Sequence, residues 1–308
     1  MLKIYQQTIT NPVSFEGVGL HTGKVAHVRI LPAKSDTGIV FKRIDLKKNN
    51  IIKANYQNVS SAKLCTTLEN NNGVKVSTVE HLLAAFYISE IDNAIIEIDN
   101  IEVPIMDGSA KNFLEIFEKL ELKQLTKKRK YLKILDKIEL KDGEKKISIC
   151  PNNLNFEIDF QLNYKNKIIG QQKNSVNFQI DKLVDVVESR TFCLFEDIEK
   201  IKKLGLAKGG SLENAVVVDD NKVLNEEGLR NNKEFVNHKI LDLAGDFLLS
   251  GFRVLGKITC YQGGHELTNN FLKKIFKSKN SSTTIKLENI IISKKLSSNQ
   301  QVKIAVNA

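Results

Sequence analysis

Apolar residues along the chain follow two periods, a two-residue alternation typical of strands and a longer repeat typical of helices. In the first part, short alternating runs lie between Gly, Pro and Asp turns and predict strands. Longer apolar stretches there predict helices, the second of them capped by Ser109. The predicted strands are 25–31, 39–44 and 94–99, and the predicted helices are 77–89 and 109–120.

The basic stretch at 123–130 has no apolar period and predicts a linker. Beyond it, strands and helices recur in a similar order. Strands are predicted at 131–140, 146–150, 155–162, 215–219 and 254–260, and helices at 181–188, 196–204, 233–250 and after Gly264.

This order predicts an α+β fold with two domains of related topology, although no residue-level repeat is visible. The expected domains are 1–125 and 126–280. A Ser-, Lys- and Asn-rich tail at 281–308 is expected to be partly disordered.

Composition excludes several classes of protein. No apolar run approaches the roughly 18–20 residues of a membrane span, and the N-terminus does not resemble a secretory signal. The four cysteines are widely spaced, so no disulfide framework is predicted and a cytoplasmic location is expected. The net charge of +10 comes mostly from lysine, because only six residues are Arg. Phosphate recognition usually favours Arg, so nucleic-acid binding is not expected.

Residues 237–246 carry the sharpest chemical pattern. On a helix, His238, Asp242 and Asp246 lie at i, i+4 and i+8 on one face. A His and an Asp at this spacing can bind one metal ion. An exposed polar stripe on an amphipathic helix explains the same pattern, and this segment alone leaves both interpretations open.

Glu80 and His81 begin another apolar helix. Glu80 fits a capping box with Ser77, in which its carboxylate would reach back to the Ser77 backbone. His81 fits a histidine of the core whose hydrogen bonds are made within the protein. Alternatively, the pair flanks a metal, with His81 binding the ion and Glu80 holding water beside it.

His265 follows a Gly-Gly turn and is either a surface residue or part of the same site. Taken together, His81, His238 and Asp242 form a catalytic zinc pattern of two His and one carboxylate with an open position. Glu80 would then act as general base and His265 as general acid. The order of residues differs from the HExxH pattern of peptidases.

Six motifs stand in an order that closely resembles the UDP-3-O-acyl-N-acetylglucosamine deacetylases of lipid A biosynthesis, over about residues 4–275. They are FEGVGLHTG (15–23), VSTVEHL (76–82), PIMDGSA (104–110), RTF (190–192), HKxxDxxGD (238–246) and GH (264–265).

The resemblance implies a zinc amidase that removes the acetyl group from a UDP-linked, 3-O-acylated amino sugar. It implies two domains, each a helical layer packed on a β-sheet, with the active site between them. Zn²⁺ would be bound by His81, His238 and Asp242. Glu80 would activate water, and the Thr191 hydroxyl would help to stabilise the oxyanion. Whether Glu80 alone or Glu80 with His265 moves the protons stays open.

A helix N-terminus lowers the pKa of a histidine, which does not suit a general acid at His265. Asp246, one turn beyond Asp242, is predicted to offset this effect and to keep His265 protonated.

Further positions are predicted to bind substrate by match to the family. Lys239 would face the phosphates or the reaction intermediate. Gln262 stands where many family members have a basic residue, so an ionic contact to a phosphate is lost there. Binding of the diphosphate would therefore depend more on Lys239 and Lys145. An acyl-chain passage would run along a helix, for which ordinary core packing is the alternative. The residues assigned to substrate binding are Lys239, Phe192, Phe160, Leu20, Cys65, Ile198, Ile201, Gly210 and Lys145.

Phe160 fits either a uracil contact or a core strand, and Cys65 fits either a reactive thiol or a buried structural cysteine. The expected partner is a small acylated UDP-amino sugar, bound by a monomer with no stable membrane insertion. Two alternatives remain: a zinc deacetylase of another amino sugar or polysaccharide, and a non-enzymatic protein that binds nucleic acid or a membrane surface through its basic charge.

Overall fold

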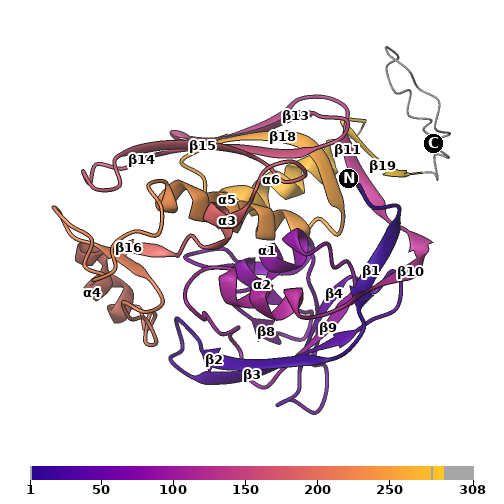
Figure 1. Cartoon of the computed structure of the whole chain (residues 1–308), viewed down its shortest axis with the longest axis horizontal. Helices are drawn as coiled ribbons and strands as arrows, with labels where there is room; N and C mark the ends of the chain where they lie inside the picture. The colour runs from indigo at the N-terminus through magenta and orange to yellow at the C-terminus, as the bar shows by residue number, and fades with distance from the viewer. Residues whose placement is uncertain (1, 279, 288–308) are drawn as a thin grey trace.

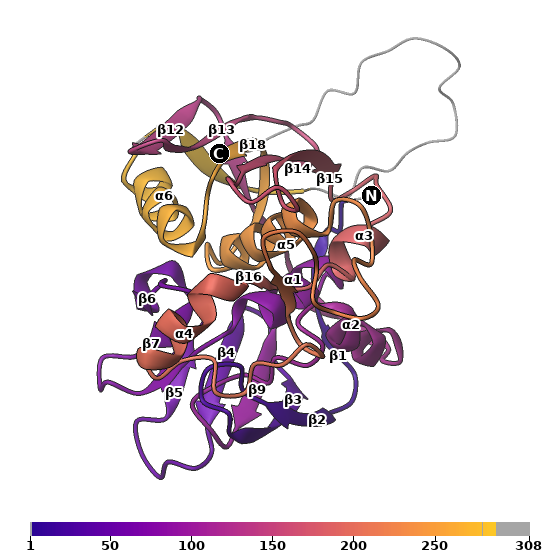
Figure 2. The same cartoon turned by 90° about the vertical axis from the view of Figure 1, so that its left-hand side faces the viewer.

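Two β-sheets enclose two layers of helices, so that the molecule is built of four layers (Figure 1). The structure is a computed structural model and describes residues 2–278 and 280–287. The first sheet and α1 and α2 come from the N-terminal part of the chain. The second sheet and α3, α5 and α6 come from the C-terminal part, and the helices of the two parts face each other in the middle (Figure 2).

The N-terminal sheet has five strands in the order β2-β3-β9-β4-β5. Alternate side chains of β3 and β9 face the core, which places Ala26, Val28 and Ile30 inward, as their period of two requires. The bounds are β2 (Val13–Val18), β3 (Val25–Pro32), β4 (Ile39–Arg43), β5 (Ile51–Lys53), β9 (Ala94–Ile98), α1 (Glu80–Ile88) and α2 (Lys111–Glu118).

The C-terminal sheet has seven strands, and β18 lies at its centre, paired with β11, β13 and β14. The helices α5 and α6 cover its inner face (Figure 1). The bounds are β11 (Lys130–Ile134), β12 (Ile138–Asp142), β13 (Lys145–Pro151), β14 (Phe156–Asn163), β15 (Gln171–Asn177), β18 (Arg253–Tyr261), β19 (Ser282–Lys286), α3 (Val184–Val187), α5 (Glu234–Leu248) and α6 (His265–Lys277).

The two sheets share one topology, which confirms the prediction of two α+β halves. In the first, β2-β3 and β3-β9 are antiparallel, β9-β4 is parallel and β4-β5 is antiparallel. In the second, β12-β13, β13-β18, β18-β14 and β14-β15 follow the same sequence of directions. The helices α1 and α5 follow the corresponding strands and are therefore equivalent elements of the repeat.

Smaller elements extend the two halves. Three short strands precede α1, and a parallel pair, β16 and β17, flanks α4 at one side of the molecule (Figure 1). The bounds are β1 (Tyr5–Ile9), η1 (Tyr56–Asn58), β6 (Val59–Ser61), β7 (Thr67–Glu69), β8 (Lys75–Val76), β10 (Leu122–Lys128), β16 (Phe192–Leu194), α4 (Phe195–Lys203) and β17 (Val216–Val218).

The prediction of a linker at 123–130 is wrong. Most of this stretch forms β10, which pairs antiparallel with β1. The strand is largely exposed and so has no apolar face to reveal it. The division between domains at 125–126 falls inside β10 and stays a prediction.

The predicted tail begins too early, because β19 pairs with β11 and extends the C-terminal sheet to residue 286. Residues 288–308, where disorder was expected, lie outside the described residues. Among the helices of the described part of the chain, none has the length and apolar character needed to cross a membrane.

The layers of the two halves dock through α1 and α5. Gly245, in α5, lies directly against the backbone of α1, and a Cβ there would collide with the carbonyl oxygen of Glu80 and lie 3.0 Å from the amide nitrogen of Ala84. A glycine at this position therefore permits the close approach of the two helices that carry the predicted metal ligands.

Candidate active site

The helices α1 and α5 bring His81, His238 and Asp242 together. The Nε2 atoms of both histidines lie 3.3 Å from Asp242 Oδ1, and the two rings are perpendicular, with centroids 5.0 Å apart. All three side chains are buried, and one donor atom from each lies within 4.8 Å of the others. Such a cluster has the spacing needed to hold one metal ion.

The hydrogen bonds of these groups fit a bound cation. Asp242 Oδ1 is buried, and in the part of the chain that the structure describes no donor binds it. An acceptor left in this state is costly unless a cation occupies the space beside it. His238 Nδ1–H donates to the carbonyl of Ser189 at 3.1 Å, which leaves the Nε2 lone pair for a metal.

The protonation states agree with this arrangement. Burial lowers the pKa of His238 to about 3, so its ring is neutral. Burial works against ionisation of Asp242, yet the Lys239 ammonium beside it holds the pKa of its carboxyl well below the usual range. Metal ligands must be deprotonated, so both residues are ready to bind.

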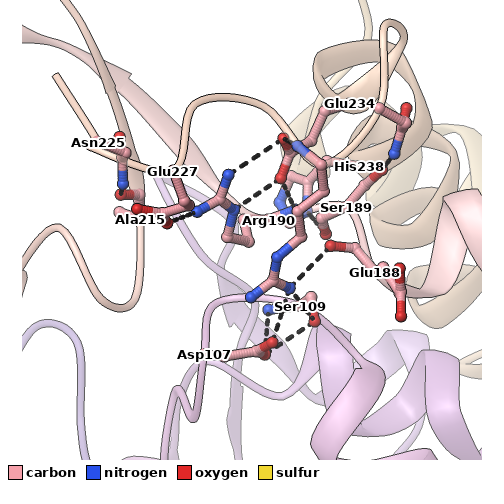
Figure 3. Close-up of polar contacts among 12 residues, drawn as sticks. Asp107, Ser109, Glu188, Ser189, Arg190, Ala215, Asn225, Glu227, Glu234 and His238 are labelled. Atoms are coloured by element: carbon pink, nitrogen blue, oxygen red, sulfur yellow. Dashed lines mark hydrogen bonds and ion pairs between the residues drawn. The ribbon is translucent and has the colours of Figure 1, made fainter. Parts of the chain in front are cut away.

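A buried ion pair stands behind His238 (Figure 3). Arg190 and Glu234 are not exposed, and Arg190 Nε lies 2.7 Å from Glu234 Oε1. Arg230 extends the network, since its Nη1 donates to Asp107 Oδ2 at 2.7 Å and to the Glu188 carbonyl at 3.0 Å. The segment that contains Ser189 is therefore held on both sides.

Glu80 is the first residue of α1 and is buried next to the ligand cluster. Its Oε2 accepts a hydrogen bond from the backbone N–H of Thr66 at 3.0 Å. The capping-box interpretation is therefore wrong: Ser77 N–H binds the Ile101 carbonyl instead. Burial raises the pKa of Glu80, as a general base requires.

His265 begins α6 and forms a close pair with Asp246, with Nδ1 2.8 Å from Oδ2. Its Nε2 lies 3.8 Å from Glu80 Oε1 and 3.8 Å from Asp242 Oδ2. Burial alone would lower the pKa of His265, but Asp246, Glu80 and Asp242 together raise it to about 10. This upward shift of the pKa agrees with a protonated His265 beside the cluster.

Lys239 lies at the edge of the cluster, and Thr191 belongs to a segment with a fixed backbone. The Thr191 backbone is fixed, because its N–H donates to the Gly108 carbonyl at 2.8 Å and its carbonyl accepts from Val216 at 2.8 Å. Lys239 Nζ lies 2.9 Å from Asp242 Oδ2 and 5.5 Å from the centroid of the Phe192 ring. Phe192 and Lys239, both predicted from their motifs, thus come together here, and Thr191 directly precedes Phe192 in the chain. The role of Thr191 stays a prediction.

The predicted acyl passage lies on α4, whose residues are all at least partly exposed. Ile198 and Ile201 are half-buried, and no residue of this helix packs fully into the core. The loop after α4 docks on the N-terminal half, since Gly209 N–H donates to the Leu20 carbonyl at 3.0 Å. A Cβ at Gly210 would lie 3.6 Å from Leu20 Cδ1, so these two predicted residues are neighbours.

Of three further residues predicted to bind substrate, two are buried and one is exposed. Phe160 is buried in the core of β14, beside Gly263. Cys65 is buried, and burial and Glu80 raise the pKa of its thiol to about 12, which does not suit a reactive thiolate. Lys145 is exposed at the start of β13, next to Lys146, which pairs with Tyr261. The roles of Phe160 and Lys145 stay predictions.

Sequence reasoning did not assign Thr66, Arg190 or Glu234 to the site. Arg190 is part of the RTF motif and Glu234 lies in the predicted helix 233–250, but neither residue received a role of its own, and their burial could not be read from one sequence. Thr66 follows Cys65 in a short loop and gave no signal of its own.

A buried cluster of two His and one Asp, with a carboxylate and a His–Asp pair beside it, is typical of metal-dependent hydrolases. The comparison with known proteins is more specific. A family model described as UDP-3-O-acyl N-acetylglycosamine deacetylase matches residues 6–277. The chain belongs to this family.

Curated relatives agree over most of their length. The UDP-3-O-acyl-N-acetylglucosamine deacetylase of Geobacter sp. (strain M21) is 42% identical over 275 residues, which cover 89% of this chain and 90% of the relative. The protein of the same name from Pseudoalteromonas translucida (strain TAC 125) is 38% identical, over 88% of this chain and 90% of the relative.

Proposed function

We propose that this chain hydrolyses the N-acetyl group of UDP-3-O-(3-hydroxyacyl)-N-acetylglucosamine, which yields the free amine and acetate, the committed step of lipid A biosynthesis. The observation that carries this proposal is the buried cluster of His81, His238 and Asp242 with an unpaired carboxylate oxygen. Membership of the deacetylase family supports the substrate.

The donor set favours zinc as the metal. Two neutral imidazoles and one carboxylate are a common catalytic zinc set, whereas Mg²⁺ and Ca²⁺ prefer oxygen ligands alone. When bound, the metal would polarise the acetamide carbonyl and make water more acidic.

The chain's own residues move the protons. Glu80 accepts a proton from the attacking water as its oxygen bonds to the acetyl carbon. The Thr191 hydroxyl donates a hydrogen bond to the developing oxyanion. His265, positively charged beside Asp246, gives a proton to the nitrogen as the C–N bond breaks. Glu80 Oε1 and His265 Nε2 lie 3.8 Å apart, so a single residue or the pair could handle both transfers.

Substrate would lie across the two halves. Lys239 would bind phosphate or the intermediate, with Phe192 beneath it. Ile198 and Ile201 would contact the acyl chain, which would end near Leu20 and Gly210. Phe160 and Lys145 would face the uridine diphosphate end. We further propose a monomer that acts in the cytoplasm, with no role in nucleic-acid binding.

A deacetylation assay with and without a chelator tests the function. We expect the zinc-loaded chain to release acetate from the acylated UDP-amino sugar and to lose activity when the metal is removed. The His238→Ala variant should lose both the tightly bound metal and the activity. If the zinc-loaded chain releases no acetate from this substrate, the proposal is wrong.

A deacetylase of another amino sugar or polysaccharide is the second candidate, because it would use the same metal and base. The partly exposed apolar side of α4 favours the acylated substrate, since an acyl chain binds largely by the apolar area it buries. Activity that rises with acyl-chain length would support the first candidate, and activity independent of acylation would support the second.

A further inference from the structure

Thr66 is buried between two carboxylates of the site. It is 1% exposed and directly precedes β7. Its backbone N–H donates to Glu80 Oε2 at 3.0 Å, and its side-chain hydroxyl donates to Asp246 Oδ1 at 2.7 Å. One residue from the N-terminal half therefore binds carboxylates on both α1 and α5.

The other oxygen of each carboxylate faces His265. Glu80 Oε1 lies 3.8 Å from His265 Nε2, and Asp246 Oδ2 lies 2.8 Å from His265 Nδ1. The four residues form a closed ring of contacts. Thr66 thus determines which oxygen of each carboxylate is turned toward the imidazole.

Such control matters because the terminal torsion of a carboxylate has a broad, nearly two-fold energy profile. A contact at one oxygen alone leaves the plane of the carboxylate poorly defined. Proton transfer requires donor and acceptor atoms within about 2.6–3.2 Å, so a rotated carboxylate or a turned imidazole loses its partner. A second hydrogen bond on the far oxygen fixes that plane.

We propose that Thr66 is a positioning residue for proton transfer in this site: its N–H holds Glu80, and its hydroxyl holds Asp246 so that Asp246 orients His265. This inference rests on the proposed function, which gives Glu80 and His265 their roles. Thr66 touches neither metal ligand nor substrate in this scheme and acts only through the two carboxylates.

A second buried threonine offers a matched control. Thr8, in β1, is 2% exposed, and its hydroxyl donates to the Asn93 carbonyl at 2.7 Å and accepts from Ala33 N–H at 3.0 Å. It makes the same kind of buried hydrogen bond away from the carboxylates. Replacement of Thr8 by Val reports what the loss of a buried hydroxyl costs the fold alone.

The test compares Thr66→Val, Thr66→Ser and Thr8→Val in the zinc-loaded chain. Valine keeps the branched shape and the backbone N–H but removes the hydroxyl. We expect Thr66→Val to lower kcat about ten- to hundredfold with little change in KM and in bound metal. Thr66→Ser should recover most of kcat, and Thr8→Val should lower the melting temperature and leave kcat unchanged.

A spectroscopic readout does not depend on turnover. In the chain labelled with ¹⁵N at histidine, the proton on His265 Nδ1 reports its hydrogen bond to Asp246. We expect its resonance to shift or disappear in Thr66→Val and to stay in place in Thr8→Val and Thr66→Ser. Should Thr66→Val fail to fold, Thr66→Ala removes the hydroxyl without pressing a methyl group on Asp246, and the same result is expected.

Wild-type kcat together with an unmoved resonance in the hydroxyl-free variant would overturn the inference. So would a rise in KM with kcat unchanged, which would place Thr66 in substrate binding. A wild-type chain that releases no acetate would instead refute the proposed function, while the resonance would still report whether Thr66 orients the Asp246–His265 pair.

Discussion

Arg190 and Glu234 form an ion pair from which solvent is excluded on both sides, with Nε and Oε1 2.7 Å apart (Figure 3). The same Glu234 oxygen accepts from the Arg190 backbone N–H at 3.1 Å. Arg190 stands between Ser189, whose carbonyl binds His238, and Thr191. Glu234 is the first residue of α5. The pair therefore fixes the start of α5, which carries His238 and Asp242, to the segment that carries Thr191, the proposed oxyanion contact.

We expect Glu234→Ala to weaken both the fold and the metal site. Removal of Glu234 leaves the buried Arg190 with the exposed carboxylate of Glu227 as its remaining ion-pair partner among the described residues. This loss costs up to about 3–5 kcal/mol of the free energy of unfolding. Loss of support behind His238 should lower metal affinity about ten- to hundredfold. Chemical denaturation and competition with a metal indicator measure the two effects. Lys200→Ala, which breaks an exposed ion pair, serves as the control and should change neither. Unaltered metal affinity in Glu234→Ala would show that the pair supports the fold alone.

A second prediction concerns Gly245. The Gly245→Ala variant places a methyl group against the backbone of Glu80, and two packed helices cannot yield without moving the site. We expect a loss of about 1–3 kcal/mol in unfolding free energy and a marked loss of metal affinity and kcat. Gly143→Asn, at an exposed turn with nothing near its Cβ position, is the matched control. Wild-type metal affinity in Gly245→Ala would contradict the role given to this contact.

Helices were predicted better than strands, for a physical reason. The apolar period of α5 extends over many residues, and this helix begins and ends within two residues of the predicted limits, 233 and 250. The helix α6 begins directly after Gly264, as predicted. In contrast, β10 and β15 are polar and largely exposed, so neither has the buried face that produces an alternating pattern. Their strand structure comes from pairing with β1 and β14, partners that local sequence does not reveal.

The His265–Asp246 pair predicts a pH effect. The charge of Asp246 raises the pKa of His265, so this proposed general acid keeps its proton to higher pH. Asp246→Asn removes that charge. We expect the basic limb of the kcat profile to move to lower pH, since the histidine now loses its proton earlier. Rate profiles of the zinc-loaded wild type and variant measure this shift, and a basic limb that does not move would rule out the coupling.

The proposed acyl passage along α4 makes a prediction about specificity. Ile198→Asp places a charge on the half-buried side of α4. An acyl chain bound there would remove water from this carboxylate, which costs free energy. We expect KM to rise much more for the acylated substrate than for its deacylated analogue. Lys202→Asp, on an exposed position of the same helix, controls for the added charge. Equal effects on both substrates would remove Ile198 from the passage.

The proximity of His238 and Asp242 could be predicted from sequence because His and carboxylate spacing on a helix is a local property. The contacts that support these residues could not be predicted from sequence. Glu80 fits a local capping box with Ser77, yet in the fold its carboxylate binds the N–H of Thr66, brought close by tertiary packing. The burial of Arg190 and Glu234 depends in the same way on packing between distant segments, and no periodicity encodes it.

The equivalence of α1 and α5 has a consequence for assembly. His81 comes from one copy of the repeat, and His238 and Asp242 come from the other. Neither copy alone has all three proposed donors, so tight metal binding would report that both copies have folded and joined. By mass action, the bound ion in turn favours the joined state over separated halves. We therefore expect metal release to mark the first step at which heat or denaturant opens the molecule, and metal uptake to mark the last step of its folding.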